Sequence, residues 1–287
     1  MSSKRGIRLT MNNHYYDHLG PLLDTEQQML EGLQFSIKSH LTHNSQQQHI
    51  STNENNSAWW DKLYPEHAGF TYQHNEWGFR SGAIQRTCDV CFYGCSQTYG
   101  EGIPESTRWC DLVAQQHGLT FNNFGIRGIG NDSILDIFWA TSQHVKMKTA
   151  VFMLNGIYRP QIVLGNGQVV EYHNMTASMN TNISTQVDLA YYKDLLFRFP
   201  DEYFEHINAQ AIIKIYQLCK LKNIRAIFST WHQTHYRNLR RIQEQLPIIL
   251  TAEIATNDIK QRTPARDRAH LGIEANADLA HLFKDLF

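Results

Sequence analysis

Short apolar runs alternate with longer amphipathic stretches from about residue 87 to the end of the chain. The short runs are rich in β-branched and aromatic residues and predict strands at 89–94, 119–125, 149–155, 224–230 and 247–254. The longer stretches repeat apolar residues every three or four positions and predict helices at 106–118, 131–145, 201–223, 235–246 and 272–287. Strands that alternate with helices predict an α/β fold with a parallel sheet covered on both faces.

Capping residues set the expected ends of two of these helices. Ser106 or Thr107 is expected at the N-cap of the first helix, and Gly118 just after its last turn. Asn131 or Asp132 is expected at the N-cap of the second helix. Each is a residue type that satisfies the hydrogen-bonding groups that a helix leaves free at its ends.

Residues 1–86 do not share the alternation, and we expect them to form an N-terminal extension to a main domain of residues 87–287. Helical periodicity over 25–41 is followed by 42–60, where Asn, Gln, Ser and His dominate and a loosely packed connector is predicted. The segment 75–82 contains aromatic residues and is expected to pack onto the main domain.

One insertion, 156–200, interrupts the alternation between the third strand and the helix after it. Its residues 161–172 place Gly-Asn-Gly between two apolar runs, which predicts a β-hairpin. Its residues 171–186 are rich in Asn, Ser and Thr and lack the apolar stripe of a lipid-binding helix. We therefore expect the insertion to form a polar wall where the third strand ends.

Composition and charge narrow the classes of function. The formal net charge is -1, and no basic stripe gives the electrostatic footprint of nucleic-acid binding. No apolar run approaches the ~18 residues of a membrane span. The first residues lack the apolar core of a signal peptide, so we expect a cytoplasmic protein.

The cysteines and paired histidines are weak candidates for a metal site. Five cysteines without a signal peptide favour reduced thiols. Cys88 and Cys91 form a CxxC, but alternation along a strand is expected to place them on opposite faces. His232 and His235 follow the fourth strand without a clear third ligand. We therefore expect no metal and no cofactor.

Chemically useful residues follow most of the strands at their C-terminal ends. Ser96 follows the first strand, Gly128 the second and Asn155 the third, while Asp267 and His270 come after the fifth. In an open parallel sheet these ends share one edge, where sites form. The sequence therefore predicts a hydroxyl, a flexible turn, an amide and an Asp/His pair at one edge.

This set fits nucleophilic catalysis. A serine hydroxyl becomes a nucleophile when a base takes its proton, and His270 titrates near neutrality. Asp267 can orient the imidazole and stabilise its protonated form. The N–H groups of Ser96 and Gly128 and the amide of Asn155 could bind an oxyanion. Each residue alone is more often a cap or a turn residue, and only their order and placement together favour a site.

The same residues carry a resemblance to a known family. YGCSQTYGEGIP, NFGIRGIGND and DRAHLG together resemble the SGNH hydrolases, also called GDSL esterases/lipases, over roughly 89–287. The resemblance implies a three-layer flavodoxin-like fold with a five-stranded parallel sheet in the order 2-1-3-4-5. It implies that Ser96 is the nucleophile, Gly128 the second-block glycine, and Asp267 and His270 the other triad members. NEWGFRSG and the GCS variant resemble members from phage and environmental bacterial sequences.

Two positions depart from the family pattern. Cys95 stands where the family usually has a supportive Asp. The third block, normally G-x-N-D, corresponds here to LNGIYR, which puts Ile157 where the oxyanion asparagine belongs. Asn155 lies two positions earlier and is the candidate substitute. The loss of one such donor typically costs ~10²–10³ in rate.

The motifs and the resemblance together predict a serine ester hydrolase with an acyl-enzyme, which water or another hydroxyl resolves. Tyr158, Arg159 and Trp231 are expected to bind the substrate, a short acyl group on a carbohydrate or other polar partner. Glu101 and Glu105 are expected in solvent rather than as a glycosidase pair. The alternative is a non-catalytic carbohydrate- or protein-binding module on the same fold, which the altered third block favours.

Overall fold

The computed structural model describes residues 58–156, 159, 161–163, 169–171, 200–231, 233–251 and 262–287. The helix predicted at 25–41 and nearly all of the polar segment 171–186 lie outside the described residues. The connector predicted at 42–60 lies outside them as far as residue 57.

A five-stranded parallel sheet forms the centre of the fold. Its strands are β1 (Thr87–Gly94), β2 (Phe121–Asn123), β3 (Lys146–Leu154), β6 (Arg225–Thr230) and β7 (Ile249–Leu250). They lie in the order β2-β1-β3-β6-β7, which is the 2-1-3-4-5 order implied by the family resemblance. β7 begins two residues later than the strand predicted at 247–254, and residues 252–254 of that prediction lie outside the described residues.

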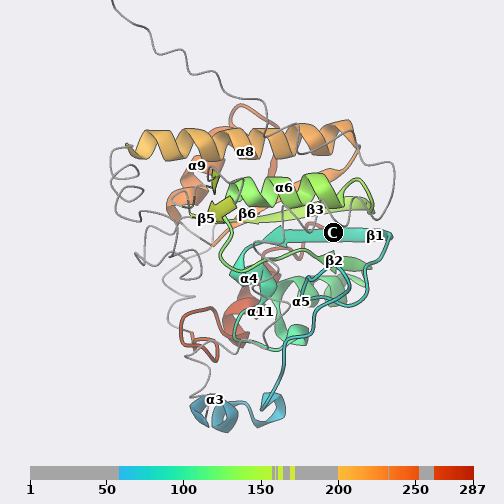
Figure 1. The fold of residues 1–287 in the computed structure, drawn as a ribbon, viewed down its shortest axis with the longest axis vertical. Coiled ribbons are helices and arrows are strands. Elements are labelled where there is room, and N and C mark those ends of the chain that lie inside the picture. The colour runs from blue at the N-terminus through green and yellow to red at the C-terminus, as the bar shows by residue number, and fades with distance from the viewer. Residues whose placement is uncertain are drawn as a thin grey trace, which may run out of the picture.

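Helices cover both faces of this sheet and make three layers (Figure 1). One layer contains α6 (Asn131–Thr141), α8 (Asp201–Leu221) and α9 (Gln233–Gln243), and the other contains α5 (Trp109–His117) and α11 (Ile273–His281). A buried apolar cluster lies under each layer. Tyr93, Phe152 and Phe228 are neighbours across β1, β3 and β6, and their rings stack at 5.2 and 5.3 Å between centroids. The predicted α/β fold is confirmed.

The predicted start of α5 is wrong. The helix begins at Trp109, not after a Ser106 or Thr107 cap, because both residues belong to the 3-10 helix η3 (Glu105–Thr107). Its end is as predicted, since Gly118 adopts the left-handed conformation with φ of +61°.

The predicted N-cap of α6 is also wrong. Gly130 occupies that position, and Asn131 and Asp132 lie inside the first turn. The side chain of Asn131 has a long-range role instead, because its Oδ1 accepts the backbone N–H of Asn155 at 2.9 Å. This contact ties the start of α6 to the end of β3.

The hairpin predicted at 161–172 is confirmed. β4 (Gln161–Val163) pairs with β5 (Val169–Glu171) as a separate antiparallel sheet. It belongs to the insertion that follows β3.

Residues 58–86 pack against the sheet domain. They include α3 (Ala58–Leu63) and the 3-10 helix η2 (Pro65–His67), and Trp60 of α3 is fully buried. Trp77 and Phe79 belong to the core cluster on the α6 side of the sheet, so the segment 75–82 packs as predicted.

Cys88 and Cys91 lie on the same side of β1, which corrects the expectation of opposite faces. Their Sγ atoms are 3.4 Å apart, and both residues belong to the core cluster on the α6 side. Alternation is interrupted because the N–H groups of Asp89 and Val90 both donate to the Thr120 carbonyl, at 3.0 and 3.1 Å. This two-against-one pairing is a bulge between β1 and β2. All five thiols are free and buried.

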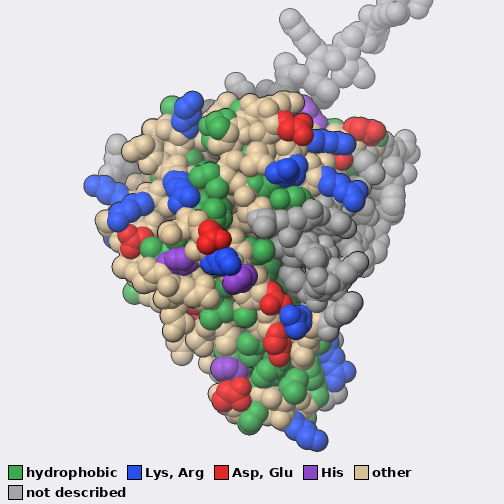
Figure 2. Space-filling model, turned by 180° about the vertical axis from the view of Figure 1, so that it is seen from behind, with side chains coloured by type: hydrophobic (Ala, Val, Ile, Leu, Met, Phe, Trp, Pro, Cys, Tyr) green, Lys and Arg blue, Asp and Glu red, His purple; other side chains and the backbone are tan. Residues whose placement is uncertain are grey.

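No helix within the described ranges is both long and apolar enough to cross a membrane. On the face seen in Figure 2, basic and acidic side chains are both scattered rather than gathered by sign.

Candidate active site

Ser96 is the first residue of α4 (Ser96–Tyr99), a single helical turn that directly follows β1. Close packing at the end of the strand requires glycine at position 94, since a Cβ there would contact the Thr98 hydroxyl and lie 2.9 Å from the Met153 carbonyl oxygen. The chain can therefore turn sharply after Gly94. Ser96 is 7% exposed, and its Oγ lies 3.6 Å from Cys95 Sγ.

The loop after α4 folds back over Ser96. The Ser96 carbonyl accepts the N–H groups of Gly100 at 2.9 Å and Glu101 at 3.1 Å. Gly102 adopts φ of +78°, and its carbonyl accepts the N–H of Arg266 at 2.9 Å. A Cβ on Gly102 would lie only 3.1 Å from Asp267 Oδ1. These contacts place the loop that follows the serine directly against the loop that carries Asp267.

Asp267 and His270 form a closed turn. Asp267 Oδ2 lies 2.5 Å from His270 Nδ1, and Asp267 Oδ1 accepts the N–H groups of Ala269 and His270 at 3.0 and 3.1 Å. Arg268 adopts φ of +62°, a left-handed conformation that bends the chain between them. The imidazole is thus held in one orientation by the carboxylate three residues before it.

Electrostatics shift the pKa values of this pair in opposite directions. Burial alone would raise the pKa of Asp267, but the hydrogen bond and charge of His270 outweigh it and lower that pKa. Burial alone would lower the pKa of His270, but the hydrogen bond to Asp267 and the charges of Glu101 and Asp267 outweigh it and raise that pKa. Arg159 opposes this increase.

Glu101 is a site residue that the sequence interpretation missed, and its expected exposure is wrong. Its side chain is 12% exposed, and Oε2 lies 3.5 Å from His270 Nε2. Its other oxygen, Oε1, accepts a hydrogen bond from Arg127 Nη1 at 3.1 Å. One signal in the sequence could have indicated Glu101. It is a carboxylate between two glycines, in the loop that follows Ser96 at the edge where the Asp/His pair is expected. Glu105, by contrast, is partly exposed and pairs with Arg108 at 2.9 Å.

Gly128 and Asn155 lie near the end of β1. The loop that carries Gly128 runs beside this end, because the N–H of Ile126 donates to the Gly94 carbonyl at 3.0 Å. Asn155 lies two residues after Met153, which is the register partner of Gly94. Its side chain is fully buried, and Nδ2 donates to the Ile129 carbonyl at 2.8 Å. Asn155 therefore anchors the glycine loop through its amide nitrogen, while its buried Oδ1 has no hydrogen-bond partner among the described residues.

Two of the three predicted substrate-binding residues can be placed. Trp231 lines a pocket of about 220 Å³ together with Gln97, Arg268 and His270. Arg159 is partly buried, and its Nη1 is shielded from solvent without a hydrogen-bond partner among the described residues. Tyr158 lies outside the described residues, as does His232.

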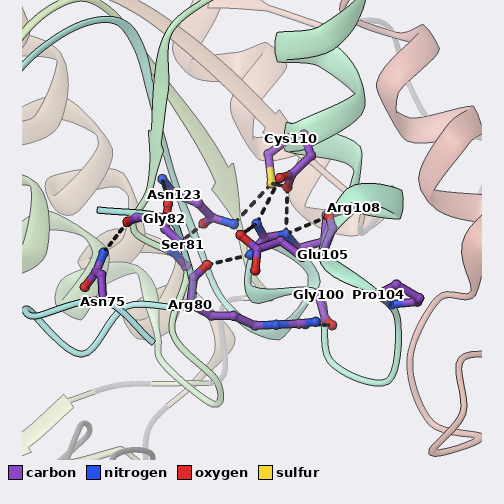
Figure 3. Close-up of polar contacts among 12 residues, drawn as sticks. Asn75, Arg80, Ser81, Gly82, Gly100, Pro104, Glu105, Arg108, Cys110 and Asn123 are labelled. Carbon is purple, nitrogen blue, oxygen red and sulfur yellow. Dashed lines mark hydrogen bonds and ion pairs between the residues drawn. The ribbon is translucent and has the colours of Figure 1, made fainter. Parts of the chain in front are cut away.

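Two buried arginines hold the loop after Ser96 (Figure 3). Arg80 extends to this loop and donates to the carbonyls of Tyr99, Gly100 and Ile103, the last at 2.7 Å. Arg108 donates to the Arg80 carbonyl at 2.5 Å. Burial and the neighbouring Arg108 lower the pKa of Arg80 to about 10. Arg80 belongs to the segment before the sheet domain, and the sequence interpretation did not include it in the site.

The described contacts do not connect every predicted site residue. Ser96 Oγ makes no hydrogen bond to His270 within the described residues, and His270 Nε2 faces Glu101. Catalytic hydrogen bonds are often long in unliganded sites and shorten when substrate binds. Ligand atoms of Glu101, Asp267 and His270 lie within 4.8 Å of one another. Both Asp267 oxygens accept hydrogen bonds, Oδ1 from the backbone N–H groups of Ala269 and His270 and Oδ2 from the imidazole of His270.

No family model matches the sequence, and no curated protein matches it. Three solved structures illustrate what the chain is similar to. A G-D-S-L family protein from Desulfitobacterium hafniense DCB-2 is 11% identical, with a TM-score of 0.45 over 71% of this chain and 100% of that one. Esterase EstA from Pseudoalteromonas sp. is 11% identical, with a TM-score of 0.44 over 70% of this chain and 96% of that one.

The third structure is a GDSL-like lipase from Bacteroides thetaiotaomicron VPI-5482. It is 12% identical, with a TM-score of 0.39 over 81% of this chain and 97% of that one.

Proposed function

We propose that the protein is a serine ester hydrolase of the SGNH type in which Ser96 forms an acyl-enzyme. The observation that carries the proposal is the Asp267–His270 pair, held at 2.5 Å and docked on the loop that begins at Ser96. A raised imidazole pKa and a buried carboxylate are the properties that a general base and its orienting partner need.

The proposed reaction follows from the protonation of His270. With Nδ1–H donated to Asp267, neutral His270 has its lone pair on Nε2. Nε2 takes the Ser96 proton while Oγ attacks the ester carbonyl carbon, and the imidazolium then protonates the leaving alcohol oxygen. A water molecule attacks the acyl-enzyme in the same way, which releases the acid and restores Ser96.

The proposed oxyanion donors are the N–H groups of Ser96 and Gly128 and the amide of Asn155. The Ser96 N–H is at the start of α4, where helix N–H groups have no partner inside the helix. The contact between Ile126 and Gly94, at 3.0 Å, supports a place for Gly128 near the serine. The position of Asn155, two residues beyond the register partner of Gly94, supports its role as the third donor.

The proposed substrate is a short acyl ester, such as an acetyl ester, of a carbohydrate or other polar alcohol. The pocket beside His270 supports this, because about 220 Å³ accommodates a small group and its lining combines Trp231 with polar Gln97 and Arg268. Activity on 4-nitrophenyl esters from C2 to C16 tests the preference. We expect kcat/KM to be highest at C2 to C4, and a maximum at C8 or longer contradicts it.

Labelling with a fluorophosphonate probe tests the function itself. We expect the probe to label the folded protein, and Ser96→Ala to abolish both labelling and hydrolysis of 4-nitrophenyl acetate. Ser106→Ala is the matched control, because Ser106 is exposed in η3 and should leave both unchanged. Labelling that persists in Ser96→Ala contradicts the assignment of the nucleophile.

A non-catalytic binding module on this fold is the second candidate. It is favoured by one observation, that His270 Nε2 faces Glu101 and not the Ser96 hydroxyl. A folded wild-type protein that the probe does not label, and that hydrolyses none of the esters, supports this candidate.

A further inference from the structure

Glu101 lies between two cationic partners at the centre of the site. Its Oε1 is 3.1 Å from Arg127 Nη1, and its Oε2 is 3.5 Å from His270 Nε2. All three side chains are largely shielded, with exposed fractions of 12% for Glu101, 18% for Arg127 and 21% for His270. Electrostatic interactions between shielded groups are stronger than those between groups in water.

The contact with Glu101 discriminates between the two protonation states of His270. Since Nδ1–H is donated to Asp267, the proton that His270 gains is carried on Nε2, which faces Glu101. In the protonated state Nε2–H and the carboxylate form an ion pair. In the neutral state the lone pair of Nε2 faces the carboxylate, so no favourable interaction is made. The contact therefore stabilises only the imidazolium.

We propose that Glu101 is a positioning residue that holds His270 after it has taken the Ser96 proton and until it protonates the leaving alcohol. This inference rests on the proposed ester hydrolysis, in which the imidazolium exists between those two steps. It gives the loop after Ser96 a second role, since the loop that supplies the nucleophile also supplies a counter-charge to the base.

Several other charged groups near His270 also affect its protonation. Asp267 binds Nδ1 and favours the protonated state, while the positive charge of Arg159 disfavours it. Arg262 and Arg268 line the same pocket as His270. Arg127 acts through Glu101, because it neutralises part of the carboxylate charge that Nε2 experiences. Removal of Glu101 and removal of Arg127 should therefore shift the titration of His270 in opposite directions.

The test compares Glu101→Gln and Arg127→Gln with the wild-type full-length protein. The titration of His270 is followed by NMR, and its signal among fifteen histidines is the one that His270→Ala removes. The pH dependence of kcat/KM is measured in parallel. We expect Glu101→Gln to lower both midpoints by about one pH unit, as removal of a counter-charge at this distance does. We expect Arg127→Gln to raise them.

Two further variants separate positioning from folding. Glu244→Gln removes the same charge at an exposed position after α9 and should leave both midpoints unchanged. Glu101→Asp keeps the negative charge, so its two midpoints should lie closer to those of the wild type than to those of Glu101→Gln. An active enzyme whose midpoints in Glu101→Gln stay within about 0.2 unit of wild type overturns the role of Glu101, even if the variant is less active. If the wild-type protein hydrolyses no ester, the proposed function is overturned instead. The NMR titration of His270 in the variants then tests the contact between Glu101 and His270 without the use of activity.

Discussion

Replacement of Gly102 by alanine should disturb the junction between the two halves of the site. Gly102 has φ of +78° and contacts the loop of Asp267 through its backbone. A Cβ at this position would lie 2.8 Å from Ala265 Cβ, 3.1 Å from Asp267 Oδ1 and 3.2 Å from the Arg266 nitrogen. Ala265 Cβ and the Arg266 nitrogen are fixed to the backbone, and Asp267 Oδ1 is held by two hydrogen bonds, so the loop that carries Asp267 and His270 must move.

The expected loss of stability has two parts. A left-handed backbone costs an L-residue roughly 1–2 kcal/mol. Overpacking in a close contact adds roughly 1–3 kcal/mol. Gly118→Ala provides the matched control, because Gly118 also has positive φ, +61°, but a Cβ there meets nothing within 4 Å. We therefore expect Gly118→Ala to show the first part only, and Gly102→Ala to be roughly 1–3 kcal/mol less stable than the control.

Urea unfolding and probe labelling together test this reasoning. In buffer without urea, where the variant is folded, we expect the fluorophosphonate to label Gly102→Ala at least tenfold more slowly than wild type. The reason is that the displacement of a catalytic group by about 1 Å costs ~10² in rate. Gly118→Ala should label at the wild-type rate, because Gly118 lies at the end of α5. Equal free energies of unfolding and equal labelling rates for the two variants would refute the proposed contact between the loops.

The remaining predictions concern the base and the oxyanion donors. His270 acts as a base only when unprotonated, and its pKa lies above the usual 6.5, so kcat/KM should rise with pH through a midpoint above 6.5 and then level off. A rate that is flat from pH 5 to 8 contradicts a histidine base. Asn155→Ala should lower kcat about 10²-fold if its amide binds the oxyanion, and a change below about threefold would leave it an anchor of the glycine loop.

The sheet and the edge that carries the site could be predicted because local periodicity encodes both. Alternation of apolar runs with amphipathic stretches predicts the strands and helices, and the parallel order then places Ser96, Asn155 and His270 at one edge. Each of these steps depends on residues near one another in the sequence. The predicted α/β fold therefore needed no information about long-range contacts.

The details that could not be predicted depend on partners far away in the sequence. Asn131 is a residue type that often occupies an N-cap, but its side chain accepts a hydrogen bond from the backbone of Asn155 instead. The sequence predicts Glu101 in solvent because glutamate side chains are mostly exposed in folded proteins. Its burial depends on Arg127 and His270, which come from two other loops. The bulge that places Cys88 beside Cys91 likewise depends on Thr120 of the neighbouring segment.

The segment before β1 has a practical consequence for any attempt to shorten the protein. A chain that begins at residue 87 would keep every proposed catalytic residue. It would lose Arg80 and also Tyr72, whose hydroxyl accepts the N–H of Gly102 at 2.8 Å. It would lose Phe70 as well, whose carbonyl and ring both contact Arg266, at 3.2 and 3.8 Å. The loops that carry Ser96 and His270 are thus held by residues outside the sheet domain, and a fragment that keeps these contacts must include Phe70.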